Sequence, residues 1–279
     1  MRTRSMLFGP AERTDFVPKF VKAGADIGVL DLEDATPETH KSTARDVLVD
    51  AGLDQHELGS MLLLVRTNDV STAHFAEDVR AAADCGASGL VVPKLESAAH
   101  VAEVRAHMDR VGLPNAVLCA GIESALGVHH CVEVAGAGAN MAYFGAEDFI
   151  TDVGGVRTES NNEVLYARSQ VALAARLGEI PVLDQVVVDY ADDARFVAEA
   201  EQARALGYAG KLCIHPNQVT LANAAFSPSE DEVSWARGVV AAAEEAERDG
   251  LGVVSYEGTM VDAPIVVRAK ALLAGLADD

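Results

Sequence analysis

The chain has 279 residues, 49% of them apolar and 23% charged, which is enough for one large α/β domain or two small ones. Its formal net charge is −21, from 43 acidic and 22 basic side chains, and a surface this acidic repels nucleic acid and anionic lipid. Because no apolar run approaches the roughly 20 residues that span a bilayer, and residues 1–10 lack the features of a signal peptide, we expect a cytoplasmic protein with no nucleic-acid or membrane partner.

Eight short apolar runs predict eight strands, at residues 5–8, 27–32, 61–65, 89–93, 116–122, 141–144, 182–188 and 210–214. None of them alternates cleanly between apolar and polar residues, which is typical of parallel strands buried on both faces. Alanine-rich amphipathic segments between them predict helices, for example at 72–84, 97–111, 163–178 and 193–206. Eight strands alternating with helices predict an α/β protein with a (β/α)8 (TIM) barrel, although periodicity alone also allows a doubly wound open sheet.

The pattern changes after the eighth strand–helix unit. The segment at residues 229–250 opens with a capping box, Ser229 with Glu232, and ends at Gly250. A short stretch then leads to a last helix from about Ile265. We therefore predict a barrel domain at residues 1–226 and a C-terminal helical lid and oligomerisation extension at residues 227–279.

Polar and charged side chains come directly after five consecutive predicted strands, from the second to the sixth. They are Glu33, Asp34, Arg66, Asn68, Lys94, Glu123, Glu147 and Asp148. In a barrel the carboxyl ends of all strands meet at one mouth, where the active site is built. One strand-end charge alone is most often a surface ion pair or a helix cap, but five in register predict a shared site. Glu147 alternates with Asp148 and is expected to point elsewhere.

The residue types in this set indicate its chemistry. Glu123 and Asp148 offer hard oxygen ligands from neighbouring strands, which suit Mg²⁺, and no histidine stands at the spacing that zinc would require. Arg66 offers a planar fork that can bind a carboxylate through two hydrogen bonds. Glu33 and Asp34 can orient metal-bound water from behind the ligands, and a helix-start cap is an equally good interpretation of Asp34. A metal beside an arginine suits a 2-oxo or 2-hydroxy carboxylate.

Taken in order, a set of motifs that covers nearly the whole chain resembles the citrate lyase β-subunit-like branch of the HpcH/HpaI aldolase superfamily. The motifs are RSMLF, LDLEDATPETHKSTAR, VRTN, VVPKLESA, GIESALGV, YFGAED, LYARSQVALAAR, GKLCIHPNQV, NAAFSPSEDEVSWAR and GTMVDAP. Two loops depart from the family pattern. The family commonly continues its first strand as LFVPG, where this chain has LFGPA, and it commonly has an arginine pair before TPEG, where this chain has only Arg157.

The resemblance implies a Mg²⁺-dependent lyase, with Mn²⁺ as an alternative ion. Its substrate would be a 3-hydroxyacyl thioester such as malyl-, citramalyl- or citryl-CoA, and its products a 2-oxo acid and an acyl-CoA. Glu123 and Asp148 would bind the metal, and Arg66 would bind the oxo-acid carboxylate. A thioesterase acting on malyl-CoA and a β subunit of a citrate lyase complex, working on an acyl-carrier partner, are the alternatives.

The resemblance also implies a role for Asp262, which lies in the GTMVDAP segment. This aspartate would enter the active site of the adjacent subunit and act as the acid or base, so the implied assembly is a homotrimer or a hexamer of two trimers. A turn or an N-cap ahead of the last helix is the alternative interpretation of Asp262. For binding the substrate and the CoA phosphates and adenine we expect basic side chains, namely Lys94, Arg4, Arg13, Lys19 and Lys41.

Overall fold

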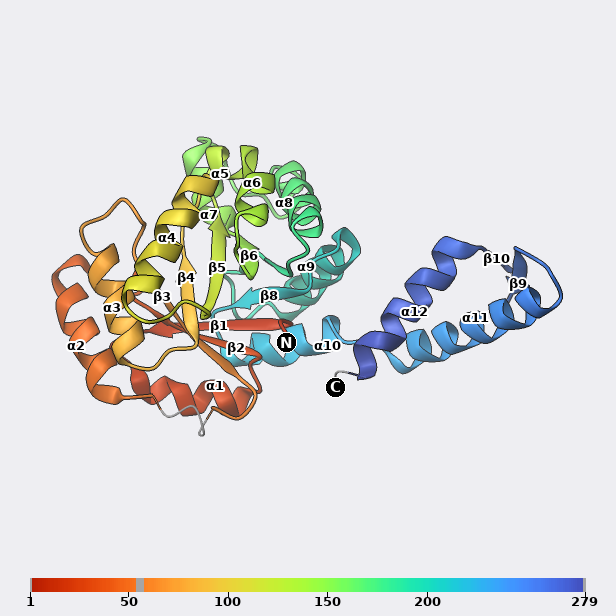
Figure 1. The fold of residues 1–279 in the computed structure, drawn as a ribbon, viewed down its shortest axis with the longest axis horizontal. Coiled ribbons are helices and arrows are strands. Elements are labelled where there is room, and N and C mark those ends of the chain that lie inside the picture. Colours follow the sequence, from red (N-terminus) through yellow and green to blue (C-terminus); the bar gives the residue numbers. More distant parts are fainter. Residues whose placement is uncertain (1, 54–57, 278–279) are drawn as a thin grey trace. The chain divides into compact units, whose positions relative to one another are not determined.

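In the computed structural model, which describes residues 2–53 and 58–277, eight parallel strands close into one barrel in chain order (Figure 1). Their bounds are β1 Ser5–Pro10, β2 Ile27–Asp31, β3 Leu62–Arg66, β4 Gly89–Val92, β5 Val117–Ile122, β6 Met141–Phe144, β7 Val182–Asp184 and β8 Gly210–Cys213. β1 pairs with β8 as well as with β2. The predicted barrel is therefore confirmed, and the doubly wound open sheet is excluded.

Helices connect the strands and surround the barrel (Figure 1). They are α1 Val17–Ala23, α2 Lys41–Ala51, α3 Phe75–Asp84, α4 Ala98–Arg110, α5 Ala125–His129, α6 Cys131–Gly136, α7 Ala146–Asp152, α8 Leu165–Leu177, α9 Asp193–Leu206 and α10 Pro216–Ala225. Local sequence sets several of the helix ends. Ser97 caps α4 by accepting a hydrogen bond from the His100 amide, and Gly24 ends α1 in the left-handed conformation that glycine adopts without steric cost.

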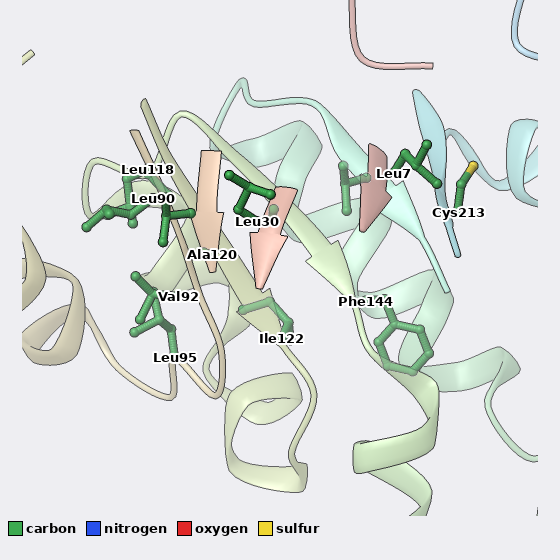
Figure 2. Packing of buried hydrophobic residues seen from close by; sticks show 14 of the residues in the cluster. Leu7, Leu30, Leu90, Val92, Leu95, Leu118, Ala120, Ile122, Phe144 and Cys213 are labelled. Atoms are coloured by element: carbon green, nitrogen blue, oxygen red, sulfur yellow. The ribbon is translucent and has the colours of Figure 1, made fainter. Parts of the chain in front are cut away.

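The strands carry two apolar layers on opposite faces. The layer between strands and helices is the larger one, and Figure 2 shows part of it. The barrel interior is filled from the strands alone, by Met6, Ile27, Val29, Leu64, Val91, Cys119, Met141, Tyr143, Leu183 and Leu212. Since side chains alternate along a strand, the next inward positions are Phe8, Asp31 and Arg66, and on β5 Glu123 comes two residues after the inward Gly121. The fold thus brings three charged groups to one mouth.

Met1–Phe226 form one compact unit and Ser227–Asp279 form a second, which is described here by itself. The second unit contains α11 Glu230–Arg248, the antiparallel strands β9 Val254–Tyr256 and β10 Thr259–Val261, and α12 Ala263–Ala277. α11 and α12 pack along each other (Figure 1), and the expected capping box of Ser229 and Glu232 begins α11. Gly238 lets β9 approach α11, because a Cβ there would lie 1.9 Å from the Tyr256 hydroxyl.

None of the helices in the described part of the chain combines the length and the apolar character that crossing a membrane requires.

Candidate functional site

A cavity of about 450 Å³ lies at the carboxyl ends of the barrel strands. Its polar lining comes from Asp31, Asp34, Arg66, Glu123, Tyr143, Glu147 and Asp148, and its apolar lining includes Phe8, Pro10, Val186, Leu212 and Ile214. Two further residues of the expected set, Glu33 and Lys94, form ion pairs with lining residues. The structure therefore brings the expected metal ligands, the expected carboxylate clamp and their neighbours into one place.

Arg66 ends β3 and is held by Asp31, which ends β2. The arginine Nε donates to Oδ1 at 2.7 Å and Nη2 donates to Oδ2 at 2.6 Å, a paired geometry that fixes the plane of the guanidinium. Asp31 is 2% exposed and also accepts the backbone amides of Glu33 and Ala35. Sequence reasoning missed Asp31 because only charges beyond the strands were considered, although Asp31 shares the inward face of Ile27.

The remaining contacts of Arg66 leave one buried carboxylate oxygen without a hydrogen bond. Arg66 Nη1 forms an ion pair with Glu33 Oε2 at 3.0 Å. This contact does not have the geometry of a hydrogen bond, and Oε2 accepts none from any group in the described residues. Burial raises the pKa of Glu33, and the positive charge of Arg66 offsets part of that rise. Phe8 lies under the guanidinium, with its ring centre 5.1 Å from the arginine Cζ.

Glu123 follows β5 and is 3% exposed. Its Oε2 accepts the Tyr143 hydroxyl at 2.9 Å and its Oε1 accepts the Lys94 amide at 3.1 Å. Burial, followed by the negative charges of Glu33 and Asp148, raises the pKa of Glu123 to about 8. The carboxylate thus sits where its negative charge is costly until a cation or a proton compensates it.

Lys94 supplies a cation between two of these carboxylates. Its Nζ lies 3.1 Å from Glu33 Oε1 and 3.3 Å from Asp148 Oδ1. Although burial alone lowers the pKa of Lys94, the carboxylates of Glu33, Glu123 and Asp148 together raise it. The lysine backbone has φ of 52°, a conformation that costs free energy and that concentrates at functional sites. The surrounding contacts hold it in this conformation.

The donor set fits a hard divalent cation. Glu123 and Asp148 provide two carboxylates beside one cavity, and Glu33 keeps a buried oxygen without a hydrogen bond. Gly145 leaves room next to them, since a Cβ there would lie 2.4 Å from Glu123 Oε2. Across residues 2–53 and 58–277, no three or more His, Cys, Asp or Glu side chains converge as a complete metal cage. Two protein carboxylates suit Mg²⁺, which usually keeps several water ligands.

The structure corrects part of the expected CoA-binding set. Arg4 precedes β1 and therefore lies at the amino-terminal end of the barrel, opposite the cavity, where it is paired with Asp26 at 2.8 Å. Lys41 is buried, and its Nζ donates to the carbonyls of Leu32 and Glu33 at 2.7 Å each. Lys41 thus holds the turn that carries Glu33, and its buried ammonium is engaged with these two carbonyls.

Arg13 and Lys19 are exposed, unlike Arg4 and Lys41. They share the carboxylate of Asp15, at 2.7 and 3.2 Å, and both lie over the ring of Phe16. They follow the carboxyl end of β1, which is the end at which the cavity opens. Their place is compatible with the expected CoA-binding role.

Glu147 lies differently from the first expectation, and the contacts of Asp34 and Asp262 bear on the two interpretations that each of them had. Glu147 lines the cavity together with Asp148 and pairs with Arg157 at 2.8 Å, so it does not point elsewhere. Asp34 is in the turn after β2 and caps no helix; its Oδ2 lies 3.4 Å from Arg66 Nη2. Asp262 directly precedes α12, and its Oδ1 accepts the Ile265 amide at 3.4 Å, as in the N-cap alternative.

Comparison with known proteins shows what this chain is similar to. Residues 4–216 match the family model described as HpcH/HpaI aldolase/citrate lyase. A citrate lyase subunit beta-like protein of Deinococcus radiodurans is 45% identical, over 97% of this chain and 96% of its own length. The human mitochondrial citramalyl-CoA lyase is 28% identical, over 96% of this chain and 83% of its own length.

Solved structures agree with these sequence relatives. A crystal structure of CitE from Mycobacterium tuberculosis, in complex with magnesium, acetoacetate and coenzyme A, has a TM-score of 0.83 to this chain at 34% identity. The match covers 97% of this chain and 96% of the CitE chain. The resemblance first drawn from the ordered motifs is therefore confirmed over nearly the full length.

Proposed function

The chain belongs to the HpcH/HpaI aldolase/citrate lyase family, and from this premise we propose that it is a Mg²⁺-dependent carbon–carbon lyase acting on CoA thioesters. It cleaves, or in the reverse direction forms, a 3-hydroxyacyl-CoA such as malyl-, citramalyl- or citryl-CoA. The observation that carries this proposal is one cavity in which an arginine fixed by Asp31 faces the carboxylates of Glu123 and Asp148. CitE from M. tuberculosis is described with magnesium, coenzyme A and an oxo acid, which supports the same ligand classes here.

Arg66 is the group that binds the carboxylate of the 2-oxo acid. Asp31 takes up two of its five N–H donors and holds the guanidinium plane in place, so the substrate meets a clamp that needs no reorganisation. Glu123 and Asp148 would hold Mg²⁺, which when bound supplies a Lewis acid for the oxygen on the carbon that becomes the carbonyl. Lys94 holds the carboxylate of Asp148 at that position and is itself paired with Glu33.

The reaction also needs a group that moves a proton. In the cleavage direction the hydroxyl of the substrate loses its proton to water and its oxygen forms the new carbonyl as the C–C bond breaks. The electron pair of that bond passes to the acyl thioester as an enolate, whose α-carbon must gain a proton. The carboxylates of the barrel are engaged with Arg66, Lys94 and the metal position. We assign the proton transfer at the α-carbon to Asp262 of an adjacent subunit, with residues 227–279 serving as lid and contact in a homotrimer or hexamer.

The test is a direct assay of products. Purified protein with Mg²⁺ is mixed with malyl-CoA or citramalyl-CoA, and glyoxylate or pyruvate is measured. The proposal expects 2-oxo acid and acyl-CoA in equal amounts, with turnover abolished by EDTA. Free CoA without 2-oxo acid indicates the thioesterase, and activity that requires an acyl-carrier protein indicates the citrate lyase subunit. No product from either substrate contradicts the proposal, provided that the assayed protein is folded, as a cooperative thermal unfolding transition shows.

A further inference from the structure

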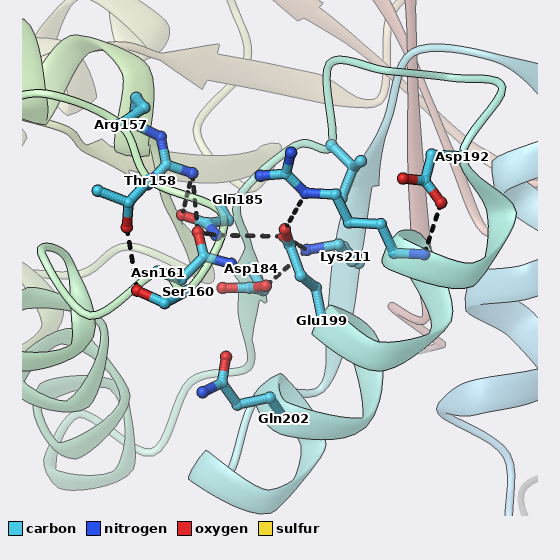
Figure 3. A network of polar contacts seen from close by, with 12 residues as sticks. Arg157, Thr158, Ser160, Asn161, Asp184, Gln185, Asp192, Glu199, Gln202 and Lys211 are labelled. Atoms are coloured by element: carbon cyan, nitrogen blue, oxygen red, sulfur yellow. Dashed lines mark hydrogen bonds and ion pairs between the residues drawn. The ribbon is translucent and has the colours of Figure 1, made fainter.

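A polar network outside the residues assigned so far holds the loop between α7 and α8 (Figure 3). Arg157 is its centre. The arginine Nε donates to Glu147 Oε1 at 2.8 Å, Nη2 donates to Asn161 Oδ1 at 3.0 Å, and Nη1 pairs with Glu163. The side chain of Arg157 is 20% exposed; Asn161 and Glu163 are largely shielded from water, whereas Glu147 is 43% exposed.

Buried residues of the barrel frame hold Arg157 from behind. Asn161 is 2% exposed, and its Oδ1 accepts Gln185 Nε2 at 3.0 Å as well as the arginine. Gln185 is fully buried directly after β7, and its Nε2 also lies 3.3 Å from Glu199 Oε2 on α9. Asn161 has φ of 54°, a strained conformation for any residue other than glycine, which persists because these contacts determine it. The guanidinium is therefore tied to β7 and α9.

On its other side Arg157 contacts Glu147, which stands next to Asp148 at the proposed metal position. Glu147 and Asp148 are neighbours in the first turn of α7, and both line the cavity. The pair with Arg157 neutralises the Glu147 carboxylate and fixes the turn on which Asp148 stands. Without Arg157, the turn that carries Asp148 would lose its connection to Asn161 and β7.

We propose that Arg157 is a positioning residue, which sets the place of the Asp148 carboxylate through Glu147 and the first turn of α7. This rests on the proposed function, because it takes Asp148 as a ligand of a divalent cation. Arg157 itself touches neither the substrate nor the metal position. Its loss should therefore weaken cation binding more than it weakens the fold, as is usual when the partner behind a ligand is removed.

The experiment measures Mn²⁺ binding by electron paramagnetic resonance, with no substrate present. Arg157→Gln should bind Mn²⁺ about 10-fold more weakly than wild type, and Arg157→Lys should recover part of that loss. Glu147→Gln should weaken binding as well. The double variant should be no weaker than Arg157→Gln, because both residues act along one connection and their effects are then not additive.

Arg105→Gln is the matched control. Arg105 on α4 is another partly buried arginine, and it donates hydrogen bonds to the carbonyls of Ala116 and Gly138. These two residues precede β5 and β6, so Arg105 lies at the end of the barrel opposite the cavity. It should keep wild-type Mn²⁺ affinity while losing a similar amount of thermal stability. Wild-type affinity in Arg157→Gln, with Glu123→Gln losing binding, overturns the inference and leaves the proposed function standing. A wild-type protein that binds no Mn²⁺ overturns both.

A second variant covers the case in which Arg157→Gln does not fold. Asn161→Gly keeps the backbone conformation, which glycine adopts readily, and removes the side-chain amide, including the carbonyl oxygen shared by Arg157 and Gln185. The inference expects a loss of Mn²⁺ affinity of several-fold in this variant, in the same direction as for Arg157→Gln. Unchanged affinity in a folded Asn161→Gly protein overturns it.

Discussion

Arg66 and Asp31 meet through two parallel hydrogen bonds, with Nε 2.7 Å from Oδ1 and Nη2 2.6 Å from Oδ2. Asp31 is almost fully buried and also accepts two backbone amides of the following turn. One carboxylate therefore fixes both the guanidinium and the segment that carries Glu33. The arginine keeps N–H donors beyond those that Asp31 occupies, and this combination suits it to bind a second carboxylate in a set orientation.

Replacing Arg66 by lysine should therefore impair binding of the 2-oxo acid although the charge is kept. An ammonium cannot reproduce the fork that Asp31 orients, and one charge-assisted hydrogen bond is worth about 1.5–3 kcal/mol. We expect kcat/KM for the oxo acid in the condensing direction to fall roughly 10- to 100-fold, with Mn²⁺ affinity unchanged. Steady-state kinetics with varied oxo acid checks this, and wild-type kcat/KM in Arg66→Lys would remove Arg66 from the proposed role.

The second prediction concerns Glu123 and magnesium. Mg²⁺ should raise the thermal unfolding temperature of the wild type, because a ligand at 100 times its Kd stabilises the folded state by about 2.7 kcal/mol. Glu123→Gln should lose this increase, since the amide is a poor ligand for the ion. Without Mg²⁺ and at pH 9 the variant should be at least as stable as wild type, because the pKa of Glu123 is raised to about 8 and its charge is unfavourable there. Differential scanning fluorimetry with and without Mg²⁺ measures both effects, and an equal increase in the two proteins would contradict the assignment.

Gly145 offers a test of the space around the same carboxylate. A Cβ at this position would lie 2.4 Å from Glu123 Oε2 and 2.7 Å from its Cβ, so an alanine must displace Glu123 or α7. We expect Gly145→Ala to lose most of its Mn²⁺ affinity and its turnover while the barrel still folds. Gly136→Ala is the matched control, since an added Cβ there meets nothing within 4 Å. Equal Mn²⁺ affinity in the two variants would show that the approach of Gly145 to Glu123 does not matter.

The barrel was predictable from sequence because its signals are local. Eight apolar runs and the helical segments between them gave the elements, and charges after five strands gave the mouth. Asp31 was not found, because inside an apolar strand a single aspartate is recognised only once the inward face of that strand is known. Arg4 was misplaced because basic residues near the chain start were considered by number, without regard to which end of a strand they flank. Lys41 lies beyond the carboxyl end of β2, but its burial against the carbonyls of Leu32 and Glu33 depends on tertiary contacts.

Contacts between distant segments were beyond sequence reasoning. Arg157 joins Glu147 through a loop whose path depends on Asn161 and Gln185, which are 24 positions apart in the chain. No periodicity or spacing encodes such a pairing. Glu147 was expected to point away from Asp148 because side chains alternate along a strand. Both residues lie instead in the first turn of a helix, where this alternation does not apply.

The network around Glu199 predicts a dependence of stability on pH. Burial alone would raise the pKa of Glu199, but Lys211 and Arg195 overcome this and lower it to about 2, from an ordinary 4.5. Because the folded protein holds this carboxylate ionised, its contribution to stability is present above pH 4.5 and is lost as the pH falls through about 2. Glu199→Gln should thus be less stable than wild type at pH 6, and the difference should narrow between pH 4.5 and 2. Urea unfolding across this range measures it, and a difference that is constant with pH would contradict the effect.

The last prediction concerns Asp262 and the assembly. If Asp262 completes the site of an adjacent subunit, Asp262→Ala should lose turnover and keep its Mn²⁺ affinity, because the metal position lies wholly in the barrel. Arg66→Ala should be inactive for the complementary reason, since it keeps Asp262 and lacks the carboxylate clamp. Co-expression of the two variants should then restore activity in mixed oligomers, in which an intact barrel meets an intact Asp262.

The size of the restored activity follows from random assembly. Half of the barrels and half of the neighbouring tails are intact, so about one quarter of all sites should work before selection, and about one third in isolated mixed trimers with head-to-tail contacts. Co-expression with two different affinity tags isolates the mixed oligomers for the assay. If these oligomers form and remain inactive, each Asp262 acts within its own subunit or not at all. If Asp262→Ala retains wild-type turnover, the proton at the α-carbon is moved by another group, and the N-cap of α12 is the whole role of this aspartate.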